Sequence, residues 1–324
     1  MENKPLVSVC MITYNHEDFI SQAIEGALMQ KTDFPIELVI GEDCSTDRTR
    51  EICLEYQQKY PEIIRILPRE KNLGMMPNFV DTLKNCQGKY IALCEGDDYW
   101  DNQQKLSYQV DFLEANLDYS GVCTSVKRYF QDTKKFEKEP YYKNLGLKQK
   151  EDITTEKLLK GFLIRTATLM FRNNLFEPNL IKNFCFGDKL IQLLISTKGD
   201  ICFFNQEDTV YRVHRGGAMH TIIPQNVHKF FKDYYDFLIF FNEHTNFKYD
   251  SSVKYRQHYL KITMNLSNKS GNFSSKVKNT IKYFLTDDSR HSMAEYNNIF
   301  TLAFPKTKSK LKMLLRNNRP GKLK

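Results

Sequence analysis

Three carboxylates crowd into one short segment, where Glu95, Gly96, Asp97 and Asp98 directly follow an apolar run. Carboxylates this close repel one another unless a cation or hydrogen-bond donors compensate. A hard divalent cation such as Mg²⁺ or Mn²⁺ takes oxygen ligands of this kind and completes its coordination with substrate phosphates. The segment therefore predicts a divalent-metal site, with a solvated acidic turn as the alternative.

Two other residues have side chains suited to a nucleotide base. Asp43 follows a second apolar run, and its carboxylate could accept a hydrogen bond from the imide N–H of uracil. Carboxylates are also common in ordinary turns. Tyr14 could stack on a base, because an aromatic face tolerates any base. An amphipathic tyrosine at the edge of the core is the alternative for Tyr14.

Asp188 stands immediately before an apolar run with helical spacing, residues 189–195. Asp at this position is a good helix N-cap. It could also act as a general base if neighbouring phenylalanine rings desolvate it and move its pKa toward the working pH. Further along, Arg212 and His214 precede two glycines and could contact a diphosphate. A lone histidine is more often structural, so His214 keeps both interpretations.

Alternating apolar runs and helix-period segments must position these side chains. Asn15 is expected to cap a helix that starts near residue 19, and Ser45 or Thr46 to cap the next. Strands that alternate with helices favour a mostly parallel sheet covered on both faces. Ligands bind beyond the carboxyl ends of such strands, so one rim should gather the polar clusters. The expected strands are residues 6–12, 36–40, 63–67 and 90–94.

The rest of the chain divides into three parts. Residues 131–160 are charged and turn-rich, and are expected to form a surface excursion. A second α/β stretch follows, and beyond Pro224 the pattern is helical, polar and Lys-rich. The expected elements of the α/β stretch are a strand at 166–171, a helix at 188–196 and extended chain at 201–204 and 210–213.

Composition limits the class of protein. The 324 residues carry a net charge of +8 and 41% apolar residues, enough for a large core. No apolar run approaches the roughly 20 residues that span a bilayer, and the N-terminus lacks a secretory pattern. Eight cysteines without a CxxC pair fit a reducing cytoplasm.

Positive charge is concentrated at the C-terminus, where residues 251–324 hold 16 Lys and Arg against three acids. Basic clusters are attracted to anionic lipid surfaces. Residues 301–324 therefore predict peripheral docking at the inner face of a membrane, where a lipid-linked acceptor would be found. A solvated basic tail is the alternative. No nucleic-acid partner is expected, because no recognition motif accompanies the charge.

Six segments together resemble the family-2 glycosyltransferases, which have a GT-A-type nucleotide-sugar fold. Their order and spacing agree with that family over about residues 5–217. The resemblance implies a GT-A-type domain at residues 1–222 and a helical, basic C-terminal region at 223–324. The matching segments are VSVCMITYNHEDFISQAI, ELVIGEDCSTDRT, NLGMMPNFVDTL, GKYIALCEGDDYW, FGDKLIQLL and YRVHRGG.

The resemblance also implies roles for individual residues. Thr13, Tyr14 and Asp43 would hold the base of a nucleotide-sugar donor, which is expected to be a UDP-sugar. Asn72 and Gly74 match a motif next to the nucleotide. The remaining assignments are Asp97 at the ribose, Asp98 at an Mn²⁺ or Mg²⁺ ion, Trp100 near the sugar or acceptor, and Asp188 as the base.

The implied reaction is a direct displacement in which a hydroxyl of a saccharide or lipid-linked acceptor attacks the anomeric carbon and inverts it. The metal stabilises the departing diphosphate. Two departures from the family pattern are Glu42 and Glu95, which stand where Asp is frequent, and Glu95 is not counted as a direct ligand. A non-catalytic nucleotide-sugar-binding protein of the same fold is the alternative. A dinucleotide oxidoreductase is disfavoured because GxGxxG is missing.

Overall fold

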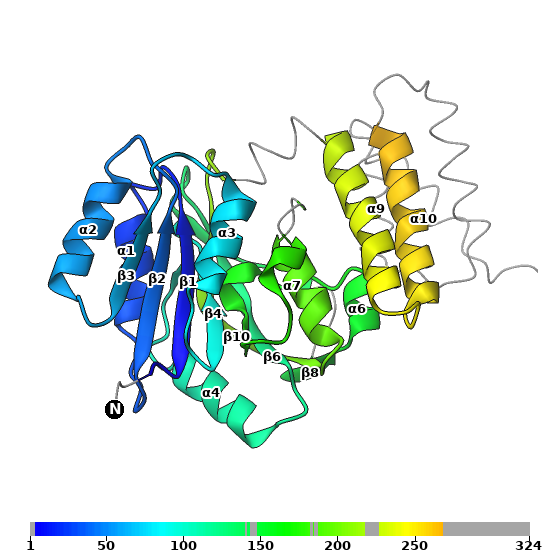
Figure 1. Cartoon of the computed structure of the whole chain (residues 1–324), viewed down its shortest axis with the longest axis horizontal. Coiled ribbons are helices and arrows are strands. Elements are labelled where there is room, and N and C mark those ends of the chain that lie inside the picture. Colours follow the sequence, from blue (N-terminus) through cyan, green and yellow to red (C-terminus); the bar gives the residue numbers. More distant parts are fainter. Residues whose placement is uncertain are drawn as a thin grey trace, which may run out of the picture.

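In this computed structural model, the described part of the chain contains one sheet of ten strands with helices on both faces (Figure 1). The structure describes residues 4–139, 141–142, 148–181, 184, 187–217 and 227–267. The strand order is β3-β2-β1-β4-β9-β6-β10-β5, while β7 pairs with β6 and β8 with β10.

The N-terminal half is the parallel part of the sheet. β1 (Val7–Thr13) lies between β2 (Ile36–Glu42) and β4 (Tyr90–Leu93), parallel to both, and β3 (Ile64–Pro68) extends the sheet beyond β2. These four strands confirm the predicted ones, with boundaries that shift by at most two residues. Their carboxyl ends consequently lie along one rim.

The second half of the sheet mixes directions. β9 (Met170–Arg172) runs antiparallel between β4 and β6, whereas β6 pairs in parallel with the long strand β10, which is interrupted by two register shifts. The two expected extended pieces at 201–204 and 210–213 are thus one strand. The bounds of the other strands are β5 Tyr99–Trp100, β6 Gly121–Phe130, β7 Lys135–Lys138, β8 Lys150–Ile153 and β10 Ile201–Val213.

Alternate side chains of the central strands enter two separate apolar clusters. Val9 of β1 belongs to the cluster under α1 (Ile20–Leu28), α2 (Thr49–Lys59) and α4 (Lys105–Ala115). Cys10, its neighbour, belongs to the cluster under α3 and α7 on the other face. Such alternation is what a strand buried on both faces produces. The helices on this second face are α3 Met75–Lys84, α6 Thr155–Leu159 and α7 Gly187–Ser196, and two short 3₁₀ turns span Thr166–Thr168 and Pro178–Ile181.

The predicted helix caps are wrong. α1 begins at Ile20 and α2 at Thr49, so neither Asn15 nor Ser45 caps a helix. Asn15 instead has φ 54° and accepts a hydrogen bond from the Thr46 N–H at 2.8 Å, while its own N–H donates to Ser45 Oγ at 3.0 Å. These polar side chains tie two loops of the rim together.

The expectation of a surface excursion holds for only part of residues 131–160. β7 is exposed, but Ile153, Leu158 and Leu159 are fully buried in the α3–α7 cluster. The sequence pattern did not predict this burial, because α6 is short and carries charged residues beside its two buried leucines. The expected strand at 166–171 is also shorter, since its first half is a 3₁₀ turn.

The helical pattern beyond Pro224 is confirmed for α9 (Val227–His244) and α10 (Asp250–Ser267). Phe237 of α9 and Val253 of α10 are buried in the same cluster as Leu190 of α7. The domain division at residue 222 remains a prediction, and the basic segment 301–324 lies outside the described residues. No helix in the described ranges has the length and apolarity needed to cross a bilayer.

Candidate active site

The carboxyl ends of three neighbouring strands bring the predicted nucleotide-binding segments together. The Asp43 N–H donates to the main-chain oxygen of Thr13 at 3.1 Å, and the Gly96 N–H donates to that of Ile12 at 3.0 Å. A β-carbon built on Gly96 would lie 2.7 Å from Thr13 Oγ1, so the acidic segment packs directly on the end of β1. The prediction that strand ends gather these clusters on one rim is confirmed.

Asp43 holds the loop that contains Asn72 and Gly74. Its two carboxylate oxygens accept the main-chain N–H groups of Leu73 and Gly74 at 2.7 and 3.0 Å. Asn72 Nδ2 donates to the Asp43 carbonyl at 3.1 Å. Burial raises the pKa of Asp43, and the two N–H donors oppose that rise. Hydrogen bonds thus hold Asn72 and Gly74 next to Asp43, which is consistent with binding of one ligand by all three residues.

Asp97 faces two histidines. Its Oδ2 lies 3.1 Å from His214 Nε2 and 3.9 Å from His16 Nε2, and His16 Nδ1 is 3.2 Å from Thr13 Oγ1. Burial opposes ionisation of Asp97, but the two imidazoles outweigh it and hold its pKa below the ordinary value. Burial lowers the pKa of His16. The three side chains come from the ends of β4, β10 and β1.

Asp98 and Arg212 point into the protein rather than toward a ligand. Asp98 is 5% exposed, its Oδ1 accepts the Arg212 N–H at 2.8 Å, and burial raises its pKa well above the ordinary value. The Arg212 guanidinium donates to the Asp97 carbonyl, Gln131 and Gln22. Each of the three guanidinium nitrogens of Arg212 thus donates to the protein, and Arg212 is 6% exposed, so direct diphosphate contact by Arg212 is not what this arrangement shows.

Glu95 and Asp188 lie close to each other on the same rim. Thr166 Oγ1 donates to Asp188 Oδ2 at 3.2 Å and also hydrogen bonds Glu95. Burial, together with Asp97 and Asp188, raises the pKa of Glu95 to about 8. Within the described residues, Glu95 Oε2 is buried without a hydrogen-bond partner.

Helix α7 delivers Asp188 to this rim and rests against α3. α7 begins at Gly187, so Asp188 lies inside the first turn and is not its N-cap. A β-carbon on Gly187 would lie 2.5 Å from Met76 Cε and 2.9 Å from Phe79 Cδ1, so α7 packs closely against α3 at this glycine. Because Met76 follows the Asn72–Gly74 loop, Asp188 lies on the same side of the sheet as that loop. Phe184, expected to desolvate Asp188, packs instead against Phe237 of α9, and Phe186 lies outside the described residues.

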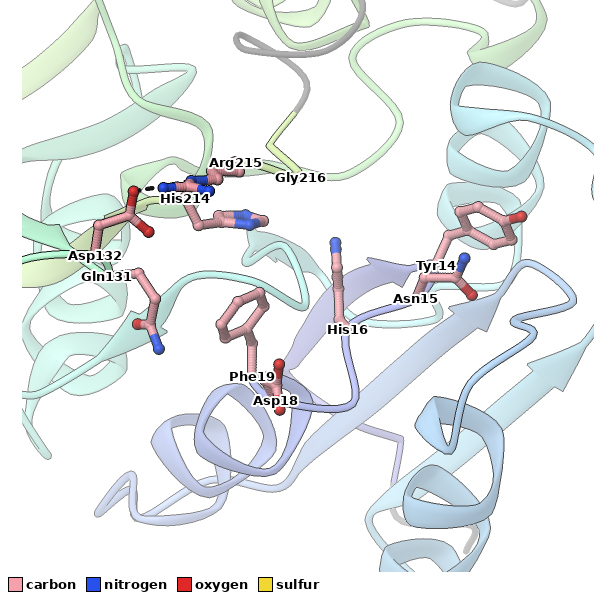
Figure 2. A pocket seen from close by; sticks show the side chains of 10 residues that line it. All are labelled: Tyr14, Asn15, His16, Asp18, Phe19, Gln131, Asp132, His214, Arg215 and Gly216. Atoms are coloured by element: carbon pink, nitrogen blue, oxygen red, sulfur yellow. Dashed lines mark hydrogen bonds and ion pairs between the residues drawn. The ribbon is translucent and has the colours of Figure 1, made fainter.

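A cavity of about 490 Å³ opens between the loop after β1 and the end of β10. Figure 2 shows the side chains that line it. Tyr14 and His16 come to it from the loop after β1, and His214 comes from the end of β10. Tyr14 is 42% exposed, which leaves its ring available for stacking. Asp43, Asp97, Asp98 and Asp188 are not part of this lining, although His16 and His214, which face Asp97, are. The lining residues are Tyr14, Asn15, His16, Asp18, Phe19, Gln131, Asp132, His214, Arg215 and Gly216.

Trp100 is a core residue. It is 1% exposed, and its Nε1 donates to the Ala167 carbonyl at 2.7 Å. The expectation that Trp100 contacts the sugar or acceptor is therefore corrected, because the ring packs in the apolar cluster under α1, α2 and α4. An isolated tryptophan after an acidic turn gives no sequence signal for which way the ring points.

Whether these residues suit a divalent cation depends on the donor set. No group of three or more His, Cys, Asp or Glu side chains converges as a complete metal site among the described residues. His214 lines the cavity, and Asp97, whose Oδ2 lies 3.1 Å from His214 Nε2, supplies a second adjacent donor. Mn²⁺ or Mg²⁺ sites in nucleotide enzymes use few protein ligands plus phosphate oxygens. The pair fits such a site.

His16 is the residue that sequence reasoning missed, since it was only one of several polar residues after β1.

The α/β sheet and its polar rim define a GT-A-type fold. The family model "Glycosyl transferase family 2" matches residues 8–176, and the chain belongs to this family. An uncharacterized protein of Mycobacterium tuberculosis is 33% identical over 66% of this chain and 61% of its own length. The putative teichuronic acid biosynthesis glycosyltransferase TuaG of Bacillus subtilis is 32% identical over 52% of this chain and 62% of TuaG. The matches thus span less than two thirds of these relatives.

Two solved structures share the fold. TarS of S. aureus in complex with UDP-GlcNAc aligns with a TM-score of 0.57 at 18% identity, over 96% of this chain and 78% of TarS. The mannosyltransferase PcManGT of Pyrobaculum calidifontis, in complex with GDP-Man and Mn²⁺, aligns with a TM-score of 0.56 at 14% identity, over 98% of this chain and 89% of PcManGT.

Proposed function

We propose that this chain is an inverting, metal-dependent glycosyltransferase that transfers a sugar from a nucleoside-diphosphate sugar, preferentially a UDP-sugar. The observation that carries the proposal is the pairing of Asp97 with His214, which lines a cavity together with Tyr14. Family membership supports the reaction class. The complexes of TarS with UDP-GlcNAc and of PcManGT with GDP-Man and Mn²⁺ support the type of donor and the use of a metal.

The nucleotide base of the donor is proposed to bind at the carboxyl ends of β1 and β2. Tyr14 offers an exposed ring for stacking, while Asp43 and the loop it holds border the same strand ends. The remaining carboxylate lone pairs of Asp43 can accept an N–H from the base. Thr13 contacts both Asp43 and Gly96 and so holds these two strand ends together next to the proposed base site.

Asp97 and His214, rather than Asp98, are the side chains proposed to hold Mn²⁺ or Mg²⁺. Asp98 is buried and already accepts the Arg212 N–H, which makes it a support for the strand end. A bound divalent cation would stabilise the negative charge that develops on the departing diphosphate. Arg212 contributes indirectly, because it fixes the Asp97 main chain and Gln131 beside the cavity.

Asp188 is proposed as the general base that removes the proton of the acceptor hydroxyl. Its carboxylate is half-buried and oriented by Thr166, and Glu95 lies next to it. A single base on the side opposite the leaving group suffices for direct displacement, so the anomeric centre inverts. The acceptor is proposed to be a saccharide or lipid-linked saccharide in surface-polysaccharide synthesis, in keeping with TuaG.

A thermal-shift screen of nucleoside-diphosphate sugars with Mn²⁺, Mg²⁺ or a chelator tests the proposal. Ligands that bind only the folded protein raise its melting temperature in proportion to affinity. UDP-sugars are expected to stabilise the protein in the presence of metal and to be hydrolysed slowly. Stabilisation without hydrolysis or transfer would favour a non-catalytic sugar-nucleotide-binding protein, and no stabilisation by any donor would contradict the proposal.

A further inference from the structure

Trp100 is hydrogen bonded to the 3₁₀ turn at Thr166–Thr168. Its Nε1 donates to the carbonyl of Ala167, the middle residue of the turn, at 2.7 Å, and Thr209 Oγ1 donates to the same carbonyl at 3.5 Å. Trp100 and Ala167 are each 1% exposed and belong to the apolar cluster under α1, α2 and α4. Because a buried carbonyl that loses its donor is costly, this hydrogen bond fixes the position of the turn.

The next carbonyl of the turn is held by α4. Gln109 Nε2 donates to the Thr168 carbonyl at 3.1 Å, and Lys105 Nζ donates to it at 3.4 Å. Lys105 is itself paired with Asp208 at 3.1 Å, and these side chains are all buried. Donors from β5 and α4 therefore hold the turn from one face of the sheet.

The first residue of the turn contacts the proposed base, which comes from a helix on the other face. Thr166 Oγ1 donates to Asp188 Oδ2 at 3.2 Å and also hydrogen bonds Glu95. One hydroxyl can serve both carboxyl groups, because it donates one hydrogen bond and can accept others. Within the described ranges, Thr166 is the hydrogen-bond donor found for the Asp188 carboxylate. The position of the turn therefore sets the direction of this carboxylate and leaves Oδ1 for the acceptor hydroxyl.

We infer that Trp100 is a positioning residue for Asp188, which fixes Thr166 through the Ala167 carbonyl and thereby directs the carboxylate toward the acceptor hydroxyl. This inference rests on the proposed function, because it takes Asp188 as the base. Trp100 is buried and acts without touching a ligand. A displacement of a reacting group by about 1 Å can cost roughly 10²-fold in rate, so small shifts of the turn matter. β5 directly follows Asp97 in the chain, and one short segment thus supports both the metal pair and the base.

The test removes the indole N–H while keeping the ring. The chain contains one tryptophan, so replacing tryptophan throughout by benzothienylalanine changes this site alone. That analogue has sulfur in place of the N–H and opens no cavity, and Trp100→Phe is the second variant. Transfer is measured on the full chain with Mn²⁺, the UDP-sugar selected by the stability screen and the saccharide that the wild type glycosylates.

Tyr90→Phe is the matched control. Tyr90 is fully buried in the same apolar cluster as Trp100, and its hydroxyl accepts a hydrogen bond from Arg172 Nη1 at 3.2 Å. Tyr90 is the first residue of β4, at the end of the strand remote from the rim. Tyr90→Phe therefore removes one buried hydrogen bond from the cluster without affecting the turn.

The inference predicts that kcat falls about tenfold in both Trp100 variants, because the base is displaced rather than lost. The KM for the acceptor and the Kd for UDP with Mn²⁺ should stay unchanged, which also shows that the proteins fold. Thr166→Val should lower kcat in the same way, and Thr166→Ser, which keeps the hydroxyl, should retain most of it. Tyr90→Phe should transfer at the wild-type rate.

Combining the tryptophan replacement with Asp188→Asn shows whether the effect passes through the base. No further loss is expected in this background, because the group that Trp100 positions can no longer accept the proton. A further tenfold loss there, wild-type kcat in the benzothienylalanine protein, or an equal fall of kcat in Tyr90→Phe would each overturn the inference. Transfer at the wild-type rate by Asp188→Asn alone would instead count against the proposed function.

Discussion

Asp97 Oδ2 and His214 Nε2 lie 3.1 Å apart although 117 positions separate them in the sequence. Two strands, β9 and β6, lie between β4 and β10 in the sheet. Asp97 and His214 can meet only because each lies beyond the end of its strand, β4 and β10 respectively. The Arg212 side chain makes the bridge rigid by donating to the Asp97 carbonyl. A carboxylate and an imidazole are thereby prearranged at the cavity before any ligand binds.

The first prediction concerns this pair. Asp97→Asn and His214→Gln should each weaken Mn²⁺-dependent UDP binding by about tenfold or more, because each removes one of few protein donors to the metal. Isothermal titration with UDP, with and without Mn²⁺, measures the effect. Asp132→Asn, which alters the same cavity at an exposed position, is the control and should bind as the wild type does.

The substitution Asp98→Asn distinguishes the role of Asp98 from that of its neighbour Asp97. Burial favours the neutral form of Asp98, and an asparagine oxygen can still accept the Arg212 N–H, so most Mn²⁺-dependent UDP binding should remain. If Asp98→Asn abolished the metal dependence while Asp97→Asn preserved it, Asp98 rather than Asp97 would be the metal ligand.

A second prediction concerns Asp43 as an anchor of the 72–74 loop. Asp43→Ala removes two charge-assisted hydrogen bonds, each worth about 1.5–3 kcal/mol, and should lower the free energy of unfolding by at least the smaller value. UDP affinity should fall as well, because the loop and the base contact are lost together. Urea denaturation and titration measure the two effects. Asp81→Ala, which removes a half-exposed partner of Arg69, should have a much smaller effect on both.

A third prediction concerns the pH dependence of stability. The pKa of Glu95 is about 8 in the folded protein and that of an ordinary glutamate is 4.5, so the unfolded chain loses this proton first. The wild type should therefore lose stability as pH rises from about 4.5 to about 8. Glu95→Gln cannot ionise and should melt a few degrees above the wild type at pH 8, with the gap closing toward pH 5. Thermal melts in chelator give the comparison, and an equal gap at both pH values would contradict it.

Sequence pattern was sufficient for the rim but not for the direction of each side chain. The four parallel strands and the clusters at their ends follow from local periodicity, because strand ends in a parallel sheet meet at one edge. Trp100 and Arg212 were assigned to ligands, yet Trp100 bonds Ala167 and Arg212 bonds Gln22. Those partners are distant in the sequence, so no local pattern indicates them.

The cap predictions failed for a related reason. Asn15 and Ser45 have the residue types of N-caps, but each satisfies a main-chain group in the other's loop. Likewise, Asp188 lies within α7 because Gly187, which fits against Met76, already begins the helix. Propensity identifies residues able to bond a free N–H, whereas the tertiary fold decides which N–H that is.

The most direct test of the central claim is the rate of sugar transfer by Asp188→Asn, measured alongside its affinity for UDP. The donor is the UDP-sugar selected by the stability screen, and the acceptor is the saccharide that the wild type glycosylates. The account predicts that transfer falls by about 10²–10⁴-fold, as loss of a general base requires, while the Kd for UDP with Mn²⁺ stays unchanged. Transfer at the wild-type rate by this variant would contradict the role of Asp188 and with it the proposed mechanism.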